Sequence, residues 1–288
     1  MADNDNRNNS GPSSEQPQGF DVLELTLGAV KHLWALRGPH SILALIVVLP
    51  YAIMGATGVL DPFYTLATAD NLPDGYFTAA VLMLAWAALW NTPAMVLWYR
   101  MFLLGPDHML KLPAGAFLER ALRLLGASAL FGLILGGVTV VVMLIAAIAT
   151  GGQGFNQGVL MAVILIAALI IGARLCLTFA SITLGHAMPF RASWEKTRGR
   201  GLTIAGAFLL CALVAALLSV AVHGVIVAGL FGPPPADGTT LVSSRWMYLV
   251  DLVLAPVSYA GSALVCAVTA AVFWRLLGRP ANVVDIEV

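Results

Sequence analysis

The stretch GLTIAGAFLLCALVAALLSVAVHGVIVAGLF, residues Gly201–Phe231, decides the fold, because it contains no Asp, Glu, Lys or Arg. A helix rises about 1.5 Å per residue and a membrane's hydrocarbon core is about 30 Å thick, so this stretch is long enough to cross it. It is rich in Leu, Ala and Val and lacks the alternating pattern of a barrel strand. We therefore predict a membrane-spanning helix.

Five further stretches are apolar for about 20 residues or more. They run near Ser41–Leu60, Thr78–Gly105, Leu124–Thr150, Val159–Gly185 and Tyr248–Leu276. Of the 288 residues, 59% are apolar and 10% are charged, whereas soluble domains carry roughly 25% charged residues. This composition excludes an ordinary cytosolic enzyme and a nucleic-acid-binding module. We predict an all-α polytopic bundle of six transmembrane helices within residues 39–278.

Lys and Arg gather on one side of the predicted spans. The connections after the first, third and fifth spans hold only Arg245 among them, and the first also carries three Asp. The other side holds Arg7, Lys31, Arg37, Lys111, Arg120, Arg123, Arg191, Lys196, Arg198, Arg200 and Arg279. Because basic residues are retained on the cytoplasmic side, both termini are expected there, with residues 279–288 as a short tail.

The N-terminal segment divides into two parts. Residues 1–18 are polar and of low complexity, so we expect a disordered cytoplasmic tail and no cleavable signal peptide. In residues 19–38, Leu23, Leu27, Val30 and Trp34 recur at helical spacing. This amphipathic juxtamembrane helix either lies along the membrane surface or is a plain cytoplasmic helix leading into the first span.

Two basic connections resemble each other and suggest an internal repeat. One reads PAGAFLERALRLLG from Pro113 and the other PFRASWEKTRGRG from Pro189; Arg100 and Arg174 lie late in the preceding helices. The repeated unit would be a helical hairpin joined by a short amphipathic cytoplasmic connector that Pro begins. Chance similarity between two short segments is the alternative.

These connectors place basic residues at the inner leaflet, where contact with anionic lipid headgroups is worth about 1 kcal/mol per residue. The candidate lipid contacts are Arg120, Arg123, Arg191, Lys196, Arg198 and Arg200. The same residues can also serve only to set the topology, and the two roles are compatible.

The candidate intramembrane polar site consists of Arg174, Asn91 and Thr92. Arg174 lies about ten residues from the inner end of its span, near mid-membrane, where an Arg costs roughly 2.5–3.5 kcal/mol. It is either an anion or substrate contact, or a structural residue that snorkels or binds helix-end carbonyls. Asn91 and Thr92 precede Pro93, which should kink the helix. That kink either lines a substrate path or simply packs in the bundle.

Small residues recur at four-residue spacing, which lets membrane helices approach closely. These stripes are Gly132 and Gly136, Ala212 and Ala216, and Ala263, Ala267 and Ala271.

No catalytic, cofactor-binding or metal-binding residue is predicted. Cys176, Cys211 and Cys266 all lie in spans without a CxxC pair, and the five His are scattered without metal-ligand spacing. Motifs of known hydrolases, metalloenzymes and nucleotide-binding proteins are absent.

Residues Gly172 to Leu209 contain the motifs most typical of a known family, in the sequence GARLCLTFASITLGHAMPFRASWEKTRGRGLTIAGAFL. The matching positions are Arg174, Leu175, Leu177, Ser193, Trp194, Thr197 and Gly199. It resembles the six-helix membrane domain fused to some glycerophosphoryl diester phosphodiesterases, and related bacterial membrane proteins of the YciC-like type. The sequence departs from the family at two positions. Ala180 stands where family members tend to have Pro, and Gly185 lies near the place where they tend to have an acidic residue. The resemblance implies a bacterial inner-membrane protein, but it does not imply phosphodiester hydrolysis, because the catalytic domain is not in this sequence.

Two functions follow as hypotheses. The first is a non-enzymatic multi-pass inner-membrane protein, a scaffold or accessory subunit that associates with lipid, another membrane protein or a second copy. The alternative is a small transporter or lipid-handling permease that uses Arg174 and the Asn91–Pro93 kink along one path. An intramembrane enzyme ranks third, because the motifs are missing.

Overall fold

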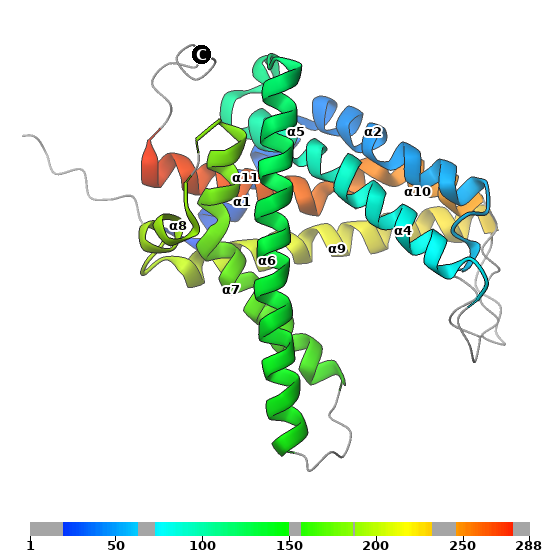
Figure 1. Ribbon diagram of the computed structural model, residues 1–288. Coiled ribbons are helices and arrows are strands. Elements are labelled where there is room, and N and C mark those ends of the chain that lie inside the picture. The colour runs from blue at the N-terminus through cyan, green and yellow to red at the C-terminus, as the bar shows by residue number, and fades with distance from the viewer. Residues whose placement is uncertain (1–19, 63–72, 150–156, 187, 232–245, 279–288) are drawn as a thin grey trace, which may run out of the picture.

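A computed structural model of the chain describes residues 20–62, 73–149, 157–186, 188–231 and 246–278 (Figure 1). The tails predicted at 1–18 and 279–288 lie outside these residues. Every regular element in the described part is a helix, which confirms the all-α prediction. Six of these helices are long and apolar enough to cross a membrane.

The helices follow the predicted order, with a short helix before the first span and another before the fifth. They are α1 (Val22–Ala35), α2 (Arg37–Ala56), α4 (Tyr76–Trp86), the π-helical turn η2 (Ala87–Asn91), α5 (Thr92–Leu104), the 3-10 turn η3 (Pro106–His108), α6 (Ala114–Ala149), α7 (Gln157–Thr183), α8 (Phe190–Lys196), α9 (Gly201–Phe231), α10 (Trp246–Ser258) and α11 (Ala260–Leu277). The second span is α4, η2 and α5 together, and the sixth is α10 and α11.

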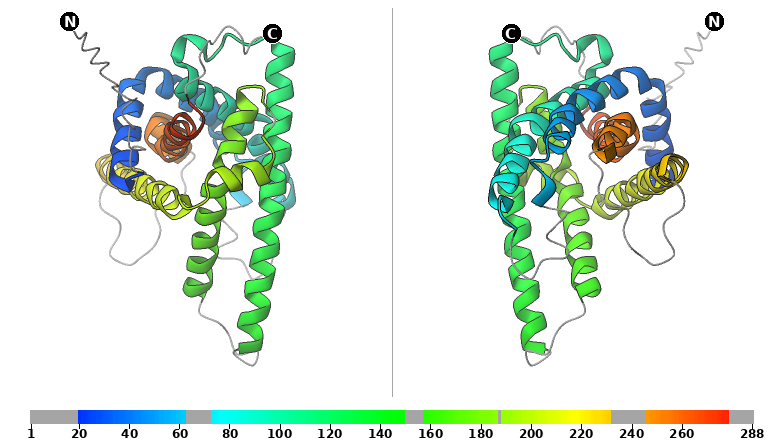
Figure 2. Two further views of the ribbon diagram at one scale, coloured as in Figure 1. Left: turned by 90° about the vertical axis from the view of Figure 1, so that its left-hand side faces the viewer. Right: turned by 90° about the vertical axis from the view of Figure 1, so that its right-hand side faces the viewer.

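The six apolar helices do not all run parallel. In Figure 1, α6 stands upright while α9, α10 and α11 run across the view. Figure 2 shows α6 still upright after a quarter turn, with α10 and α11 seen end-on. The hairpin of α6 and α7 therefore crosses the other helices, and its far end projects beyond them.

The first predicted connector is not a separate element, which corrects the prediction of two similar connectors. Its residues form the first turns of α6, which runs unbroken from Ala114 to Ala149. The second connector does form a short helix, α8, followed by a turn at Gly199 with a positive φ of 78°. The second connector ends in Arg-Gly-Arg-Gly, whereas the equivalent part of the first is Leu-Arg-Leu-Leu, whose helix propensity carries the helix onward.

Two tryptophans of the second span form hydrogen bonds with α2 close to Pro50. Pro50 lacks a backbone N–H and therefore leaves the carbonyl of Ile46 without its usual helical donor. The indole Nε1 of Trp90 donates to that carbonyl at 2.9 Å, and Trp86 donates to the carbonyl of Val47 at 3.0 Å. Side chains from the neighbouring helix thus satisfy the backbone where α2 is interrupted.

Small residues allow the closest helix contacts, but only the predicted stripe on α11 is used in this way, where Ala271 is half-buried against the core. Ala263 and Ala267 of α11 are buried. On α9 the packing face is one residue away from the prediction, because Cys211 and Ala215 are buried while Ala212 and Ala216 are exposed. The predicted stripe on α6, Gly132 and Gly136, is open, since nothing lies within 4 Å of a Cβ placed on either residue.

Helix α1 presents two apolar faces. One face, which includes Leu25 and Ala29, is buried against α9 and α11. Of the predicted stripe, Leu23, Leu27 and Trp34 form the other face, where Leu27 is 57% and Trp34 is 70% exposed. Val30 is instead half-buried against the core. Asp21 caps the helix by accepting a hydrogen bond from the backbone N–H of Leu23 at 3.0 Å. The helix is thus fixed to the other helices while an apolar stripe remains uncovered.

Candidate functional site

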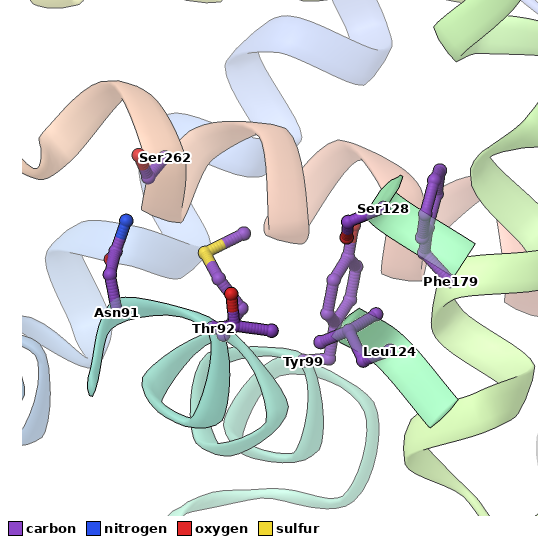
Figure 3. Close-up of a pocket in the computed structure, with 8 residues that line it drawn as sticks. Asn91, Thr92, Tyr99, Leu124, Ser128, Phe179 and Ser262 are labelled. Atoms are coloured by element: carbon purple, nitrogen blue, oxygen red, sulfur yellow. The ribbon is translucent and has the colours of Figure 1, made fainter. Parts of the chain in front are cut away.

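A polar cavity of about 350 Å³ lies where the hairpin of α6 and α7 crosses α5 and α11 (Figure 3). It is lined by Asn91, Thr92, Met95, Tyr99, Leu124, Ser128, Phe179 and Ser262. These residues come from η2 and from four different helices, which places amide and hydroxyl groups on several walls. None of the lining side chains carries a full charge at neutral pH.

The π-helical turn before Pro93 positions the amide of Asn91. Pro93 donates no hydrogen bond to the preceding turn, and residues Ala87–Asn91 form a wider turn there. The hydroxyl of Thr92 donates to the carbonyl of Ala87 at 3.1 Å. Figure 3 shows the Asn91 amide pointing towards Ser262 of α11. Its oxygen Oδ1 is buried and has no hydrogen-bond partner among the described residues, so the cavity offers an unused acceptor.

A second cavity of about 290 Å³ adjoins the first and is apolar. Its walls come from α5, α6, α7, α9 and α11, and include Phe131, Leu165, Leu169, Phe208, Ala212 and Val265. Tyr99 and Phe179 line both cavities. The ring of Phe179 meets that of Phe131 edge-on, with centroids 6.0 Å apart.

Arg174 is not among the residues that line either cavity. Its guanidinium carbon lies 4.7 Å from the centre of the Trp194 ring on α8. A Cβ on Gly201, the first residue of α9, would lie 2.6 Å from Arg174 Cδ, so the side chain crosses the start of that helix. The hydroxyls of Ser193 and Thr197 donate to the Arg174 carbonyl at 2.8 and 3.2 Å.

These contacts place Arg174 beside the connection between α7 and α9. The part of α7 that precedes Arg174 is about 25 Å long at 1.5 Å per residue. The last turns of α7 run past the start of α9, so Arg174 lies level with the connector and not midway along its neighbours. The structure brings Asn91 and Thr92 together at the polar cavity and places Arg174 elsewhere.

Three arginines late in a span hold the adjoining segment on the basic side. Arg174 holds α8, as described above. Arg100 is fully buried and donates to the carbonyl of His108 at 2.9 Å, in the segment after α5. Arg275 of α11 pairs with Glu24 of α1. The three arginines share a structural role, because each guanidinium fixes a short segment against the end of a span.

The predicted lipid contacts differ in their accessibility. Arg120 is buried and donates to the carbonyl of Thr183 at 3.1 Å, so its guanidinium caps the end of α7. Arg200 is half-buried, with its guanidinium 4.7 Å from the centre of the Phe20 ring. The exposed members of the set are Arg123, Arg191, Lys196 and Arg198. Arg123 pairs with Glu119 and Arg191 pairs with Glu195.

His40 is a connecting residue that the sequence pattern does not reveal. Its Nε2 lies 2.8 Å from the carbonyl of Pro256, and its Nδ1 accepts from Trp98 Nε1 at 3.2 Å. The ring therefore donates through Nε2, which makes it a neutral imidazole that links α2, α5 and the kinked end of α10. Its partners lie 58 and 216 residues away in sequence, so no local motif marks it.

Neither the metal-ligating side chains that the structure describes nor the chain's comparison with known proteins assigns a ligand to the site. Within the described residues no group of three or more His, Cys, Asp or Glu could hold a metal ion. No family model, curated protein or solved structure matches the chain.

Proposed function

We propose that the chain is a non-enzymatic multi-pass protein of a bacterial inner membrane, with cytoplasmic termini, that acts as a scaffold or accessory subunit. The single observation that carries this proposal is the exposure of α6. In residues 126–145 no side chain is buried, and the exposed residues include Leu133, Val140 and Ile145. A helix that is apolar all round and protrudes from its own bundle is suited to contact lipid or another membrane helix.

The glycine stripe of α6 favours a protein partner on one face. Gly132 and Gly136 lie one turn apart, and nothing lies within 4 Å of a Cβ placed on either. Between membrane helices there is little hydrophobic driving force, so association relies on close backbone approach at such small residues. We take the partner to be another membrane protein or a second copy of this chain.

The distribution of arginines supports a structural role over transport along a charged path. Arg100, Arg120 and Arg174 contact segments of the chain itself. The exposed Arg123, Arg191, Lys196 and Arg198 suit anionic headgroups at the inner leaflet. The resemblance of residues 172–209 to a bacterial membrane domain supports the same location.

Cysteine crosslinking in native membranes tests the scaffold proposal. In a background without Cys176, Cys211 and Cys266, we would place Gly132→Cys or Gly136→Cys on the glycine face. Ile134→Cys, on the opposite side of the same helix, is the matched control. The proposal predicts an adduct, with another protein or with a second copy, from the glycine face only. Equal adducts from both faces, or none from either, would contradict it.

A permease is the second candidate, and the polar cavity favours it. The unused Oδ1 of Asn91 and the π-helical turn beside it are features that recur at functional sites. In this permease, Asn91 and Thr92 would line the substrate path and Arg174 would take no part in it. Asn91→Cys and Ser262→Cys should then react with a membrane-impermeant thiol reagent, and substrate should slow that reaction. Lack of reaction from both sides of the membrane would exclude an aqueous path here.

A further inference from the structure

The polar and apolar cavities form a pair with opposite chemistry. The first, of about 350 Å³, presents the amide of Asn91 and the hydroxyls of Thr92, Ser128 and Ser262. The second, of about 290 Å³, is walled mainly by aromatic and aliphatic side chains. The two meet at Tyr99 and Phe179, which line both. A ligand that extends past these rings would have a polar end in one cavity and an apolar part in the other.

The lining also restricts the charge of such a ligand. No Asp, Glu, Lys, Arg or His lines either cavity. A charged headgroup would therefore lose its hydration without gaining a counter-charge, which costs several kcal/mol. An uncharged donor is favoured instead, because the buried Oδ1 of Asn91 has no partner among the described residues and a ligand hydroxyl can supply one.

We infer that the two cavities together bind one uncharged amphiphile, with a hydroxyl head in the polar cavity and a single hydrocarbon chain in the apolar cavity. The head donates a hydrogen bond to Asn91 Oδ1 and exchanges hydrogen bonds with the surrounding hydroxyls. The chain lies along α7 between Leu165 and Phe179, facing Phe208 and Val265. This site can be tested separately from the scaffold role, because neither Gly132 nor Gly136 lines either cavity.

Photolabelling of the full chain in lipid nanodiscs tests the site. The probe is a sixteen-carbon fatty alcohol that carries a diazirine in its chain, and mass spectrometry maps the labelled peptides. Competition uses unlabelled oleyl alcohol and, separately, oleate, which differ in the charge of the head. Labelling should fall on the peptides of α7, α9 and α11 that line the apolar cavity. Oleate should compete roughly a hundredfold more weakly than oleyl alcohol, because its carboxylate enters uncompensated.

Two pairs of variants separate binding from folding. Ala212→Phe fills the apolar cavity from an exposed position on α9, so labelling should be lost. Ala216→Phe, one turn further along and outside the lining, should label like the parent chain. Asn91→Leu removes the acceptor and should weaken binding about tenfold, the value of one buried hydrogen bond. Thr139→Val, on the exposed part of α6, should leave binding unchanged.

Several results would overturn the inference. Equal labelling of the Ala212→Phe and Ala216→Phe variants would show that the probe reports only the lipid-exposed surface. Equal competition by alcohol and carboxylate would remove the argument from charge. Unchanged affinity in a folded Asn91→Leu variant would remove the head site. Failure of crosslinking at Gly132 would leave all of these measurements intact, so the scaffold proposal and this one fail separately.

Discussion

Substitution of Gly55 by Ala should weaken the contact between α2 and α10. Tyr248 lies flat on the backbone of α2 at Gly55 and is only 1% exposed. A Cβ at this position would overlap Cγ, Cδ1 and Cε1 of the Tyr248 ring. Because Cγ is fixed next to the Tyr backbone, a rotation of the far end of the ring cannot relieve the overlap. Either the ring or the helix has to move.

Two opposing effects set the expected magnitude. Replacing a helical Gly by Ala stabilises a helix by about 0.5–1 kcal/mol. Inserting a methyl group into a packed contact costs about 1–3 kcal/mol. The overlap involves three ring atoms, so the packing cost should be the larger effect. We expect a net loss of about 1–2 kcal/mol in the free energy of unfolding.

Unfolding in mixed detergent micelles, followed by circular dichroism, measures this loss. Gly224→Ala is the matched control, because Gly224 lies in α9 and has nothing within 4 Å of an added Cβ. That variant should be neutral or more stable. In a Tyr248→Leu background, Gly55→Ala should cost at least about 1 kcal/mol less, since the two sites are in contact. Equal stability of the Gly55→Ala and Gly224→Ala variants would refute the reasoning.

Four further predictions concern hydrogen bonds between helices and the basic residues near helix ends. Trp90→Phe should lower the free energy of unfolding by about 0.6 kcal/mol, the average for a hydrogen bond in a membrane. In a Pro50→Ala background the loss should vanish, because the restored N–H bonds to the Ile46 carbonyl. His40→Phe should cost about 1–3 kcal/mol in the same assay, since Trp98 and the Pro256 carbonyl lose their partner. Arg174→Lys should cost about 0.5–2 kcal/mol through the lost stack on Trp194, without changing labelling by the fatty alcohol. Arg120→Gln should destabilise the fold, because the Thr183 carbonyl loses its donor. Neutralising the exposed Lys196 and Arg198 should leave stability unchanged. It should weaken the binding of anionic lipid by about 1 kcal/mol per residue, measured by native mass spectrometry.

The helices were predictable because length and apolar content alone determine them. Gly201–Phe231 forms α9 with the same bounds that its composition predicts. The interruptions at Pro93 and Pro256 also follow from local chemistry, since each proline removes a backbone donor. The continuity of α6 was not predicted, because a basic segment that follows a proline also suits a separate connector. The helix propensity of its Leu-rich sequence decides for the longer helix.

The candidate site was only half predictable. Asn91 and Thr92 stand out because an amide and a hydroxyl beside a proline are unusual in an apolar span. Ser128 and Ser262 do not stand out, since single hydroxyls are common in membrane helices and can bond to their own backbone. Helices that are apolar all round have no periodicity to indicate which face meets which neighbour. The neighbours of Arg174 were unpredictable for the same reason, because they depend on how far α7 slides past α9.

The steep crossing of the α6–α7 hairpin accounts for both the cavities and the uncovered helix. Helices that cross at a steep angle touch only near the crossing point, so their side chains cannot fill the space on either side of it. Both cavities lie at this crossing, between the hairpin and α5, α9 and α11. In Figure 1, the helix ends next to the basic connections lie at the top and left, and the opposite ends lie at the right and bottom. All six helices therefore keep their basic ends on one side of the molecule, although the α6–α7 hairpin crosses the others steeply. The geometry that opens the two cavities also leaves the far half of α6 uncovered, with Gly132 and Gly136 open on one face.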